Sequence, residues 1–391
     1  MFFRLAVFFL LFASPAYACD FSTLNKTLSG TVESELKKRS IPGAAYVIVN
    51  NNQIVALETF GYTDKAKSSK INDNTVFRLA SVSKPFAATI TTMLAQENQL
   101  DLSDPVTKYV PHFSLATEGS AEKIQLKHVL SHSSGLMPNA YDNLLHENWS
   151  MEKVVSRFDR VKPICEPAKC YGYQNIVYGF VEPAIEASQP KSYSELLQEK
   201  IFSPLKMDDA SIGFDAFQSH NNTAKPHVLR KRVKTGKKDG QGKDIRKYIW
   251  RTVKVEDDFY KVAPAAGVNA SITDLSKWLI ANMGHQPEVL SPELIAELTT
   301  PRIKTKKDLR RRYWKKYLTD AHYGYGWRIY QFNDSPIIYH SGWVEGYRAD
   351  IGYSPELDIG FAVLINAESN VINKISSDFW ALAHEISTNN K

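Results

Sequence analysis

Strand-like segments lie near both ends of this 391-residue chain, and a mostly helical stretch lies between them. Apolar runs at 44–49 and 54–57 flank Asn50-Asn51-Asn52-Gln53, a pattern that predicts a hairpin of two strands. Further strands are expected in an antiparallel meander at 327–330, 337–339, 349–353 and 360–365. This arrangement predicts an α+β fold, in which an antiparallel sheet is formed by the N- and C-terminal parts and carries flanking helices.

The chain is expected to fold as a single domain over residues 19–391. Its sheet region covers about 22–104 and 265–391, and an inserted, mostly helical region covers about 105–264. Helices are predicted at about 22–39, 82–97, 176–186, 273–281 and 375–384. A site in the seam between the sheet region and the helical region is expected.

The first residues resemble an export signal rather than part of a fold. Arg4 precedes an unbroken apolar run from Leu5 to Ala13, and Ala16-Tyr17-Ala18 has the small-residue pattern that a signal peptidase cuts. The run is shorter than the roughly 20 residues that span a membrane. Residues 1–18 are therefore predicted to be a signal peptide, and the mature protein to be secreted or periplasmic.

Three cysteines occur in the chain, at Cys19, Cys165 and Cys170. An oxidising compartment favours a Cys165–Cys170 disulfide, and free buried thiols are the alternative. Cys19 is left over and could carry a lipid anchor, although Ala16 stands where a lipoprotein signal usually has leucine.

Positive charge is concentrated in two segments of a chain whose formal net charge is +6. The stretch 225–254 holds twelve Lys and Arg against two Asp, and 302–316 holds nine against one. The first lies in a glycine-containing basic insertion at about 219–256, expected to be exposed. Both segments could bind an anionic envelope surface or be solvated loops. No motif suggests binding to nucleic acid.

Ser81-Val82-Ser83-Lys84 is the first motif whose residues could take part in catalysis. Residues three apart at the start of a helix share a face, so the Lys84 amine can lie beside the Ser81 hydroxyl and act as its base. The S-x-x-K pattern occurs six times in the chain, but only this copy lies between a strand-like approach and a long helix.

Tyr173-Gln174-Asn175 forms a second motif, before the helix predicted at about 176–186. A tyrosine whose phenol pKa is lowered can accept the serine proton and return it to a leaving group. Asn175 could hold Lys84 or bind a substrate amide. An aromatic residue packed beside a capping asparagine is the alternative reading.

His340-Ser341-Gly342, followed by Trp343, forms a third motif directly after a predicted strand. A strand edge here can present its backbone to an extended acyl group, and Gly342 permits a close approach. A histidine in such a place is otherwise a structural residue.

These three motifs, in this order and at these separations, resemble those of the class C β-lactamase family. The family also contains D-alanyl-D-alanine carboxypeptidases, D-amino-acid peptidases and esterases, all penicillin-recognising serine hydrolases or their relatives. The resemblance extends over almost the whole mature chain. Supporting segments are Leu130-Ser131-His132-Ser133-Ser134-Gly135-Leu136, Pro264-Ala265-Ala266-Gly267 and Tyr323-Gly324-Tyr325-Gly326-Trp327.

The resemblance implies that Ser81 forms an acyl-enzyme while Lys84 and Tyr173 share the proton transfers. The oxyanion is expected between the backbone N–H groups of Ser81 and Trp343. Asn175 is expected to contact the substrate amide. His340, Ser341 and Gly342 are expected along the acyl side of the substrate. No metal or organic cofactor is expected.

One departure from the family pattern concerns His340, where class C β-lactamases usually have lysine. A histidine with a pKa of about 6.5 is only partly charged at neutral pH, which favours the peptidase and esterase members. The predicted function is hydrolysis of an amide or ester: a D-Ala-type peptide, a β-lactam or a small ester.

The sequence lacks the motifs of two other classes of hydrolase. The chain holds no G-x-S-x-G elbow and no H-E-x-x-H zinc motif. A sensor that is acylated by a β-lactam without turnover is the remaining alternative.

Overall fold

A computed structural model describes residues 20–333 and 335–389, so the predicted signal peptide and Cys19 lie outside the described residues. An eight-stranded antiparallel sheet has the order β2-β1-β13-β12-β11-β10-β9-β8. Its strands are β1 (Gly43–Asn50), β2 (Gln53–Gly61), β8 (Ile303–Lys304), β9 (Leu318–Tyr323), β10 (Arg328–Phe332), β11 (Ser335–Val344), β12 (Tyr347–Ser354) and β13 (Ile359–Ile365). Since β1 pairs with β13, the two ends of the chain form one sheet, and the predicted fold class is confirmed.

Strand β1 shows how the sheet separates two hydrophobic cores. Its side chains alternate between the faces of the sheet, as in any strand. Val47 and Val49 pack into the core toward the helical region, whereas Tyr46 and Ile48 pack into the core on the opposite face. Both sets are fully buried, so helices cover the sheet on both sides.

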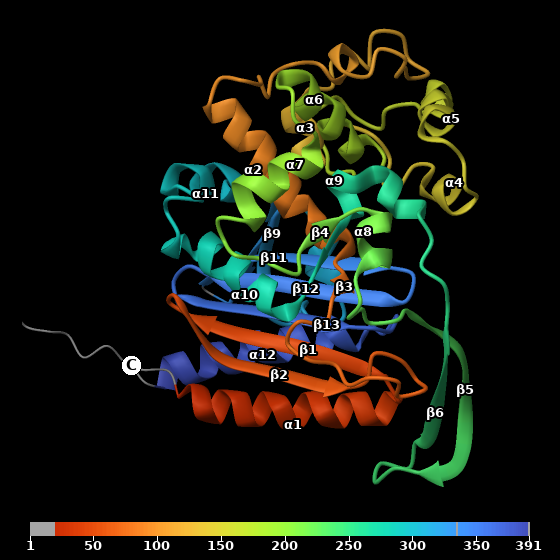
Figure 1. Ribbon diagram of the computed structural model, residues 1–391, viewed down its shortest axis with the longest axis vertical. Coiled ribbons are helices and arrows are strands. Elements are labelled where there is room, and N and C mark those ends of the chain that lie inside the picture. The colour runs from red at the N-terminus through yellow and green to blue at the C-terminus, as the bar shows by residue number, and fades with distance from the viewer. Residues whose placement is uncertain (1–19, 334, 390–391) are drawn as a thin grey trace, which may run out of the picture.

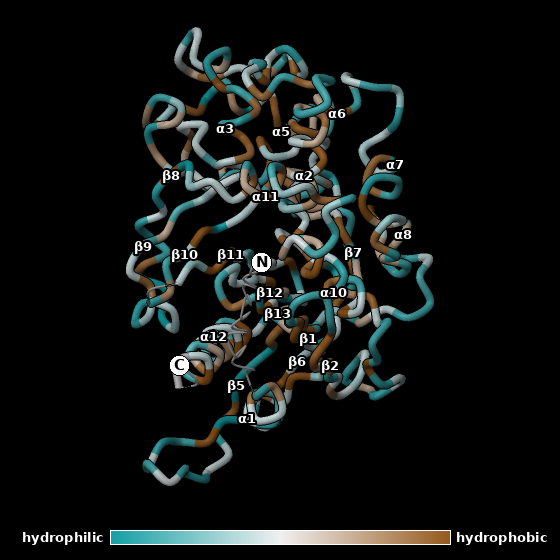
Figure 2. Tube along the Cα trace, turned by 90° about the vertical axis from the view of Figure 1, so that its left-hand side faces the viewer, coloured by the Kyte–Doolittle hydropathy of each residue, from teal (hydrophilic) through white to brown (hydrophobic). Residues whose placement is uncertain are grey.

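Helices α1 (Phe21–Arg39) and α12 (Val371–Asn389) pack together under one face of the sheet (Figure 1). Helix α10 (Ile272–Ile280) packs on the other face, against β1 and β13. In the hydropathy tube of Figure 2, α1 lies below the strands and α12 lies to their left, and the two helices contact each other. The helices predicted near both termini and at about 273–281 are therefore present.

Helix α2 (Ser83–Gln96) joins the sheet region to the helical region and is buried along almost its whole length. The remaining helices are α3 (Leu126–Leu130), α4 (Asp142–His146), α5 (Met151–Ser156), α6 (Val181–Ser188), α7 (Tyr193–Leu197), α8 (Phe214–Ser219), α9 (Ala263–Ala266) and α11 (Pro292–Thr299). A small sheet of β3 (Phe77–Arg78), β7 (Val268–Ala270) and β4 (Ser211–Ile212) lies beside them. The chain thus enters α2 from a short strand, as the sequence predicts.

The basic insertion folds as a two-stranded hairpin with two register shifts, which the sequence did not predict. Strands β5 (His227–Lys238) and β6 (Asp244–Thr252) pair with each other alone and extend away from the body of the protein (Figure 1). Among the described residues, no helix is both long enough and apolar enough to cross a membrane.

Candidate active site

Ser81 lies in a single 3₁₀ turn, Ala80–Val82, immediately before α2. Ala80 has a φ of 51°, a left-handed conformation that a residue with a side chain seldom adopts. Ser83 fixes the turn, because its hydroxyl donates to the Ala80 carbonyl at 2.7 Å and accepts from the Val268 amide at 2.9 Å. The strained turn therefore has a defined geometry that places Ser81 at the start of α2.

Lys84 is fully buried at the centre of the site. Its Nζ lies 3.5 Å from Ser81 Oγ, 2.7 Å from Asn175 Oδ1 and 3.1 Å from the Ala265 carbonyl. Burial lowers the pKa of Lys84 well below its ordinary value. A lysine in this state has access to its neutral form and can accept a proton from the neighbouring hydroxyl.

Tyr173 completes the predicted trio of side chains. The centre of its ring lies 4.6 Å from Lys84 Nζ, and the Ser81 side chain lies close enough to the phenol to influence its pKa. Burial raises the pKa of Tyr173, although Arg328 and the Ser81 side chain act in the opposite direction. The lowered pKa that the sequence predicts is therefore wrong. The phenol is instead protonated at rest, which suits it to donate and relay a proton.

Asn175 connects Lys84 to a carboxylate that the sequence did not point to. Its Nδ2 donates to Asp142 Oδ2 at 2.7 Å, while its Oδ1 accepts from Lys84. Burial raises the pKa of Asp142. Asp142 lies at the start of α4, and no sequence motif includes it. Only its hydrogen bond with Asn175 indicates that it belongs to the site.

His340 is placed differently from our expectation. It is fully buried beneath the site and is not among the described residues that line the cleft. Its Nε2 lies 2.9 Å from the Tyr323 hydroxyl, and its Nδ1 lies 3.1 Å from the Ser341 carbonyl. Burial lowers the pKa of His340 well below its ordinary value, and Arg328 and Lys84 lower it further. His340 is therefore neutral and supports the site from below, whereas the sequence predicted a partly charged residue along the substrate.

Ser341, Gly342 and Trp343 do line the cleft, as predicted. The pairing of β10 with β11 ends at Tyr339, while β11 stays paired with β12 as far as Val344. One edge of the strand beyond Tyr339 therefore has no strand partner within the described sheet. Trp343 is exposed on this part of the strand.

Gly342 is required by a close backbone contact. A Cβ atom there would lie 2.1 Å from the Leu79 carbonyl oxygen, in the segment that leads to Ser81. The sequence predicts that a substrate approaches Gly342 closely. In the structure, the group that lies close to Gly342 is instead the Leu79 carbonyl, just before the turn that holds Ser81. This contact holds the free edge of the strand beside Ser81.

Gly342→Ala is therefore expected to destabilise the protein by about 1–3 kcal/mol and to lower kcat/KM more than tenfold, because the added methyl group forces β11 away from the serine turn. Urea unfolding and steady-state kinetics measure the two effects. Gly30→Ala in α1 is the matched control, since its Cβ has no atom within 4 Å. Equal behaviour of the two variants would contradict the role of this contact.

Arg328 is the main residue of the site that sequence reasoning missed. Its side chain is 13% exposed, forms an ion pair with Asp308, and places its guanidinium carbon 5.6 Å from the centre of the Tyr173 ring. It lies in β10, directly after the Tyr323–Trp327 segment. Its position at the start of an apolar strand is the one signal in the sequence, because an arginine that is mostly buried is usually paired.

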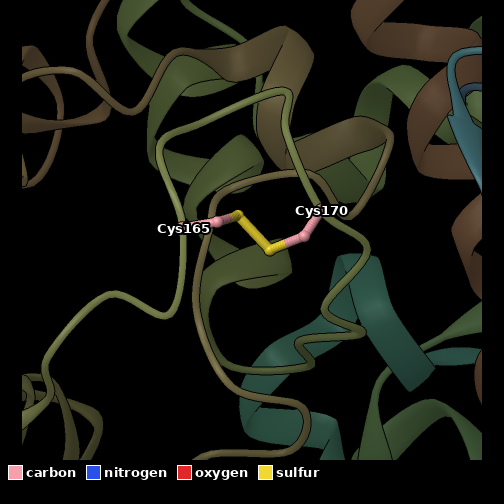
Figure 3. The surroundings of a disulfide bond; sticks show 2 residues. All are labelled: Cys165 and Cys170. Carbon is pink, nitrogen blue, oxygen red and sulfur yellow. A yellow bond between two sulfur atoms is a disulfide. The ribbon is translucent and has the colours of Figure 1, made fainter.

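The predicted disulfide between Cys165 and Cys170 is present and closes a short loop just before Tyr173 (Figure 3). The loop is bound to the segment at 132–135, since the Gly172 amide donates to the His132 carbonyl at 2.8 Å. The ring of His132 packs on that of Tyr173, with ring centres 4.0 Å apart. The disulfide therefore helps to hold Tyr173 in place.

Replacing both cysteines by serine is expected to lower the free energy of unfolding by about 2 kcal/mol, because a closed loop of this length restricts the unfolded chain by that amount. Urea unfolding with and without a reductant measures it. The double variant should be insensitive to the reductant. Unchanged stability of the wild type on reduction would contradict the expectation.

A cleft of about 1700 Å³ opens above these residues, between the sheet region and the helical region. Ser81, Tyr173 and Asn175 lie at its floor, and Arg328 also lines it. Acidic and basic side chains both line the cleft, among them Glu256, Asp258, Glu345 and Glu368, and Lys304, Lys306, Lys307, Arg310 and Arg348.

The chain is similar in sequence to known proteins. "Protein flp" of Staphylococcus aureus (strain MRSA252) is 25% identical over 346 residues, which are 88% of this chain and 63% of that protein. "Unguisins hydrolase ungD" of Aspergillus violaceofuscus is 23% identical over 370 residues, 89% of this chain and 62% of that protein. The chain thus matches less than two thirds of the length of these relatives.

Two solved structures share the fold. The octameric penicillin-binding protein homologue from Pyrococcus abyssi superposes with a TM-score of 0.75 at 24% identity, over 93% of this chain and 77% of that one. A class C beta-lactamase mutant superposes with a TM-score of 0.69 at 18% identity, over 95% and 98% of the two chains. The family model described as Beta-lactamase matches residues 28–384. The chain therefore belongs to the beta-lactamase family.

Proposed function

We propose that this protein is an exported serine hydrolase that cleaves an amide or ester through an acyl-enzyme on Ser81. One observation carries the proposal. The amine of Lys84 is buried, has a lowered pKa and lies 3.5 Å from Ser81 Oγ. A serine hydroxyl needs such a base before it attacks a carbonyl. The name of the hydrolase from Aspergillus violaceofuscus supports the enzymatic reading.

In the acylation step, neutral Lys84 takes the Ser81 proton as Oγ bonds to the substrate carbonyl carbon. Backbone N–H groups of Ser81 and Trp343 hold the resulting oxyanion, in the gap between the serine turn and β11. When the intermediate collapses, the protonated Tyr173 phenol gives its proton to the leaving nitrogen or oxygen, and Lys84 returns its proton to Tyr173. Lys84 is then neutral again.

In the deacylation step, a water molecule replaces the leaving group. Tyr173 and Lys84 accept its proton by the reverse path, and the ester bond to Ser81 breaks as Oγ recovers a proton. Asn175 keeps the Lys84 amine in place through both steps, since it accepts a hydrogen bond from Nζ at 2.7 Å. Asp142 in turn accepts from Asn175 and fixes its orientation.

The pH dependence of kcat/KM should follow Lys84. Because the base must be neutral, the rate is expected to rise as the pH rises through the Lys84 pKa, which burial places well below 10.5. Lys84→Arg keeps a charged group at this place and should lose activity at every pH. A profile that rises only near the ordinary lysine pKa would contradict the assignment.

A substrate panel tests the proposed function. Acyl-D-Ala-D-Ala peptides, short-chain esters and a chromogenic cephalosporin should be compared by product formation over many turnovers. Steady turnover of at least one of them supports the hydrolase. One equivalent of product followed by arrest with every substrate would instead identify the acylated sensor.

A further inference from the structure

The β5–β6 hairpin carries a large excess of positive charge. The segment 225–254 holds twelve Lys and Arg against Asp239 and Asp244. Asp239 accepts the backbone amide of Lys243 at 2.9 Å in the tip of the hairpin, and Asp244 forms an ion pair with Lys234 at 2.7 Å. Both carboxylates are therefore engaged within the hairpin, while most of its cations are exposed to solvent.

The pairing of the two strands divides the side chains of the hairpin between two faces. Residues opposite each other in an antiparallel pair point to the same side, and each side recurs at every second residue. Trp250 and Tyr248 therefore share one face, and Lys247 and Ile249 share the other. We call the face with Trp250 the inner face and the face with Lys247 the outer face.

The inner face makes its contacts within the protein. Trp250 is buried and donates from Nε1 to the Arg39 carbonyl at 2.8 Å, at the end of α1. Farther along, Arg232 is opposite Tyr248 and places its guanidinium carbon 5.3 Å from the centre of that ring. Lys234, two residues on, is the cation of the ion pair described above. The inner face thus has partners for its cations as well as for its indole.

The outer face mixes cations with exposed apolar side chains, so that each lysine is opposite an apolar residue. Its members beyond the root of the hairpin are Lys231, Val233, Ile245, Lys247 and Ile249. Val233 and Ile245 are 40% and 42% exposed, and they are two of the six exposed large apolar side chains among residues 20–333 and 335–389. In the part of the chain that the structure describes, Lys234 on the inner face is the one cation of the two strands with an ion pair. The outer face is therefore both basic and apolar, and its lysines are available to a partner.

Contacts at the root give the hairpin a constant direction. Besides the Trp250 contact, the His227 amide donates to the Gly346 carbonyl at 3.2 Å, and the His227 carbonyl accepts from the Glu368 amide at 3.1 Å. The hairpin extends from this root past the end of α1, away from the helical region (Figures 1 and 2). The last turn of α1 is itself basic, with Lys37 and Lys38. Hairpin and helix end therefore place positive charge on one side of the molecule.

An anionic lipid bilayer fits both components of the outer face. Each lysine near such a surface is attracted to it, and apolar side chains gain free energy when they enter the boundary between headgroups and acyl chains. A soluble polyanion would use the lysines alone and leave Val233 and Ile245 in water. We infer that the outer face of the β5–β6 hairpin docks the protein on an anionic lipid bilayer. The inference is independent of the proposed function, because Ser81 and its neighbours take no part in it.

Co-sedimentation with vesicles tests the docking. Vesicles of phosphatidylcholine with phosphatidylglycerol should bind the protein, and vesicles of phosphatidylcholine alone should bind it much more weakly. Added salt should weaken the binding to the anionic vesicles, because ions screen exposed charges. Equal binding to the two kinds of vesicle would overturn the inference.

Two charge reversals separate the outer face from the net charge of the hairpin. Lys231→Glu with Lys247→Glu should weaken binding to the anionic vesicles more than about tenfold, because each cation at such a surface contributes independently. Arg232→Glu with Arg246→Glu changes the net charge by the same amount on the inner face, and it should weaken binding clearly less. Equal losses in the two variants would show attraction to net charge alone and contradict the assignment to the outer face.

Val233→Ser with Ile245→Ser separates a lipid surface from a soluble polyanion. It should weaken vesicle binding about tenfold, through the loss of apolar contact, and leave binding to heparin unchanged. Ile54→Ser with Ile164→Ser is the matched control, since these side chains are also exposed, at 45% and 59%, and lie outside the hairpin. It should bind vesicles as the wild type does.

All the substituted side chains are on the surface, so each variant should keep the thermal unfolding midpoint of the wild type within a few degrees, which checks that a loss of binding is not a loss of folding. Vesicle binding that the two serines leave unchanged would overturn the inference. Binding to heparin without binding to the anionic vesicles would also overturn it, and would assign the hairpin to a soluble polyanion instead.

Discussion

Ser81→Ala is expected to lower kcat for every substrate by a factor on the order of 10⁶, because the variant lacks the hydroxyl that forms the proposed acyl-enzyme. Nothing in the packing opposes this change. Ser81 is only half-buried, and the strained turn is held by Ser83 rather than by Ser81. The variant should therefore fold normally, which a thermal unfolding measurement checks.

A second serine in the same pattern provides the control. Ser203 and Lys206 repeat the S-x-x-K spacing, but neither residue lines the cleft. Ser203→Ala should keep full activity. Residual turnover by Ser81→Ala well above background would assign the nucleophile to another residue.

Tyr173→Phe is expected to lower kcat by about 10²–10⁴, the usual contribution of a placed acid–base group. The variant keeps the ring that packs on His132, so the loss reflects the phenol oxygen alone. Its effect should be larger for amides than for activated esters, because a leaving nitrogen depends on protonation and a good leaving oxygen does not.

Tyr171→Phe is the matched control for this prediction. Tyr171 lines the same cleft two residues earlier, and its buried hydroxyl has no hydrogen-bond partner among the described residues. It should retain near-normal kinetics. Similar losses in both variants would assign Tyr173 a packing role.

The sheet could be predicted because its signal is local. Strands such as β1 and β13 are continuous apolar runs with turn residues at their ends, and antiparallel neighbours at the C-terminus follow one another along the chain. The β5–β6 hairpin was missed for the opposite reason. Its strands are covered with lysine and arginine on both sides, so they lack the apolar alternation from which a strand is recognised.

The candidate site was only partly accessible from sequence. Ser81, Lys84, Tyr173 and Asn175 belong to short motifs, and the structure brings them together. Arg328 has a place in the site only because β10 begins beside Tyr173. This is a long-range contact that no local pattern encodes.

Burial explains why the charge states of His340 and Tyr173 differ from those that the sequence predicts. Neither the neutral His340 nor the raised pKa of Tyr173 could be read from residue type, because both follow from removal of the side chains from water.

The most direct test of the account is peptide mapping by tandem mass spectrometry after brief exposure of the intact protein to benzylpenicillin or a fluorophosphonate. We predict one adduct per chain, on the Oγ of Ser81, formed more slowly when Lys84 is replaced by methionine. An adduct on any other residue, or unchanged labelling without the amine, would contradict the central claim that Lys84 activates Ser81.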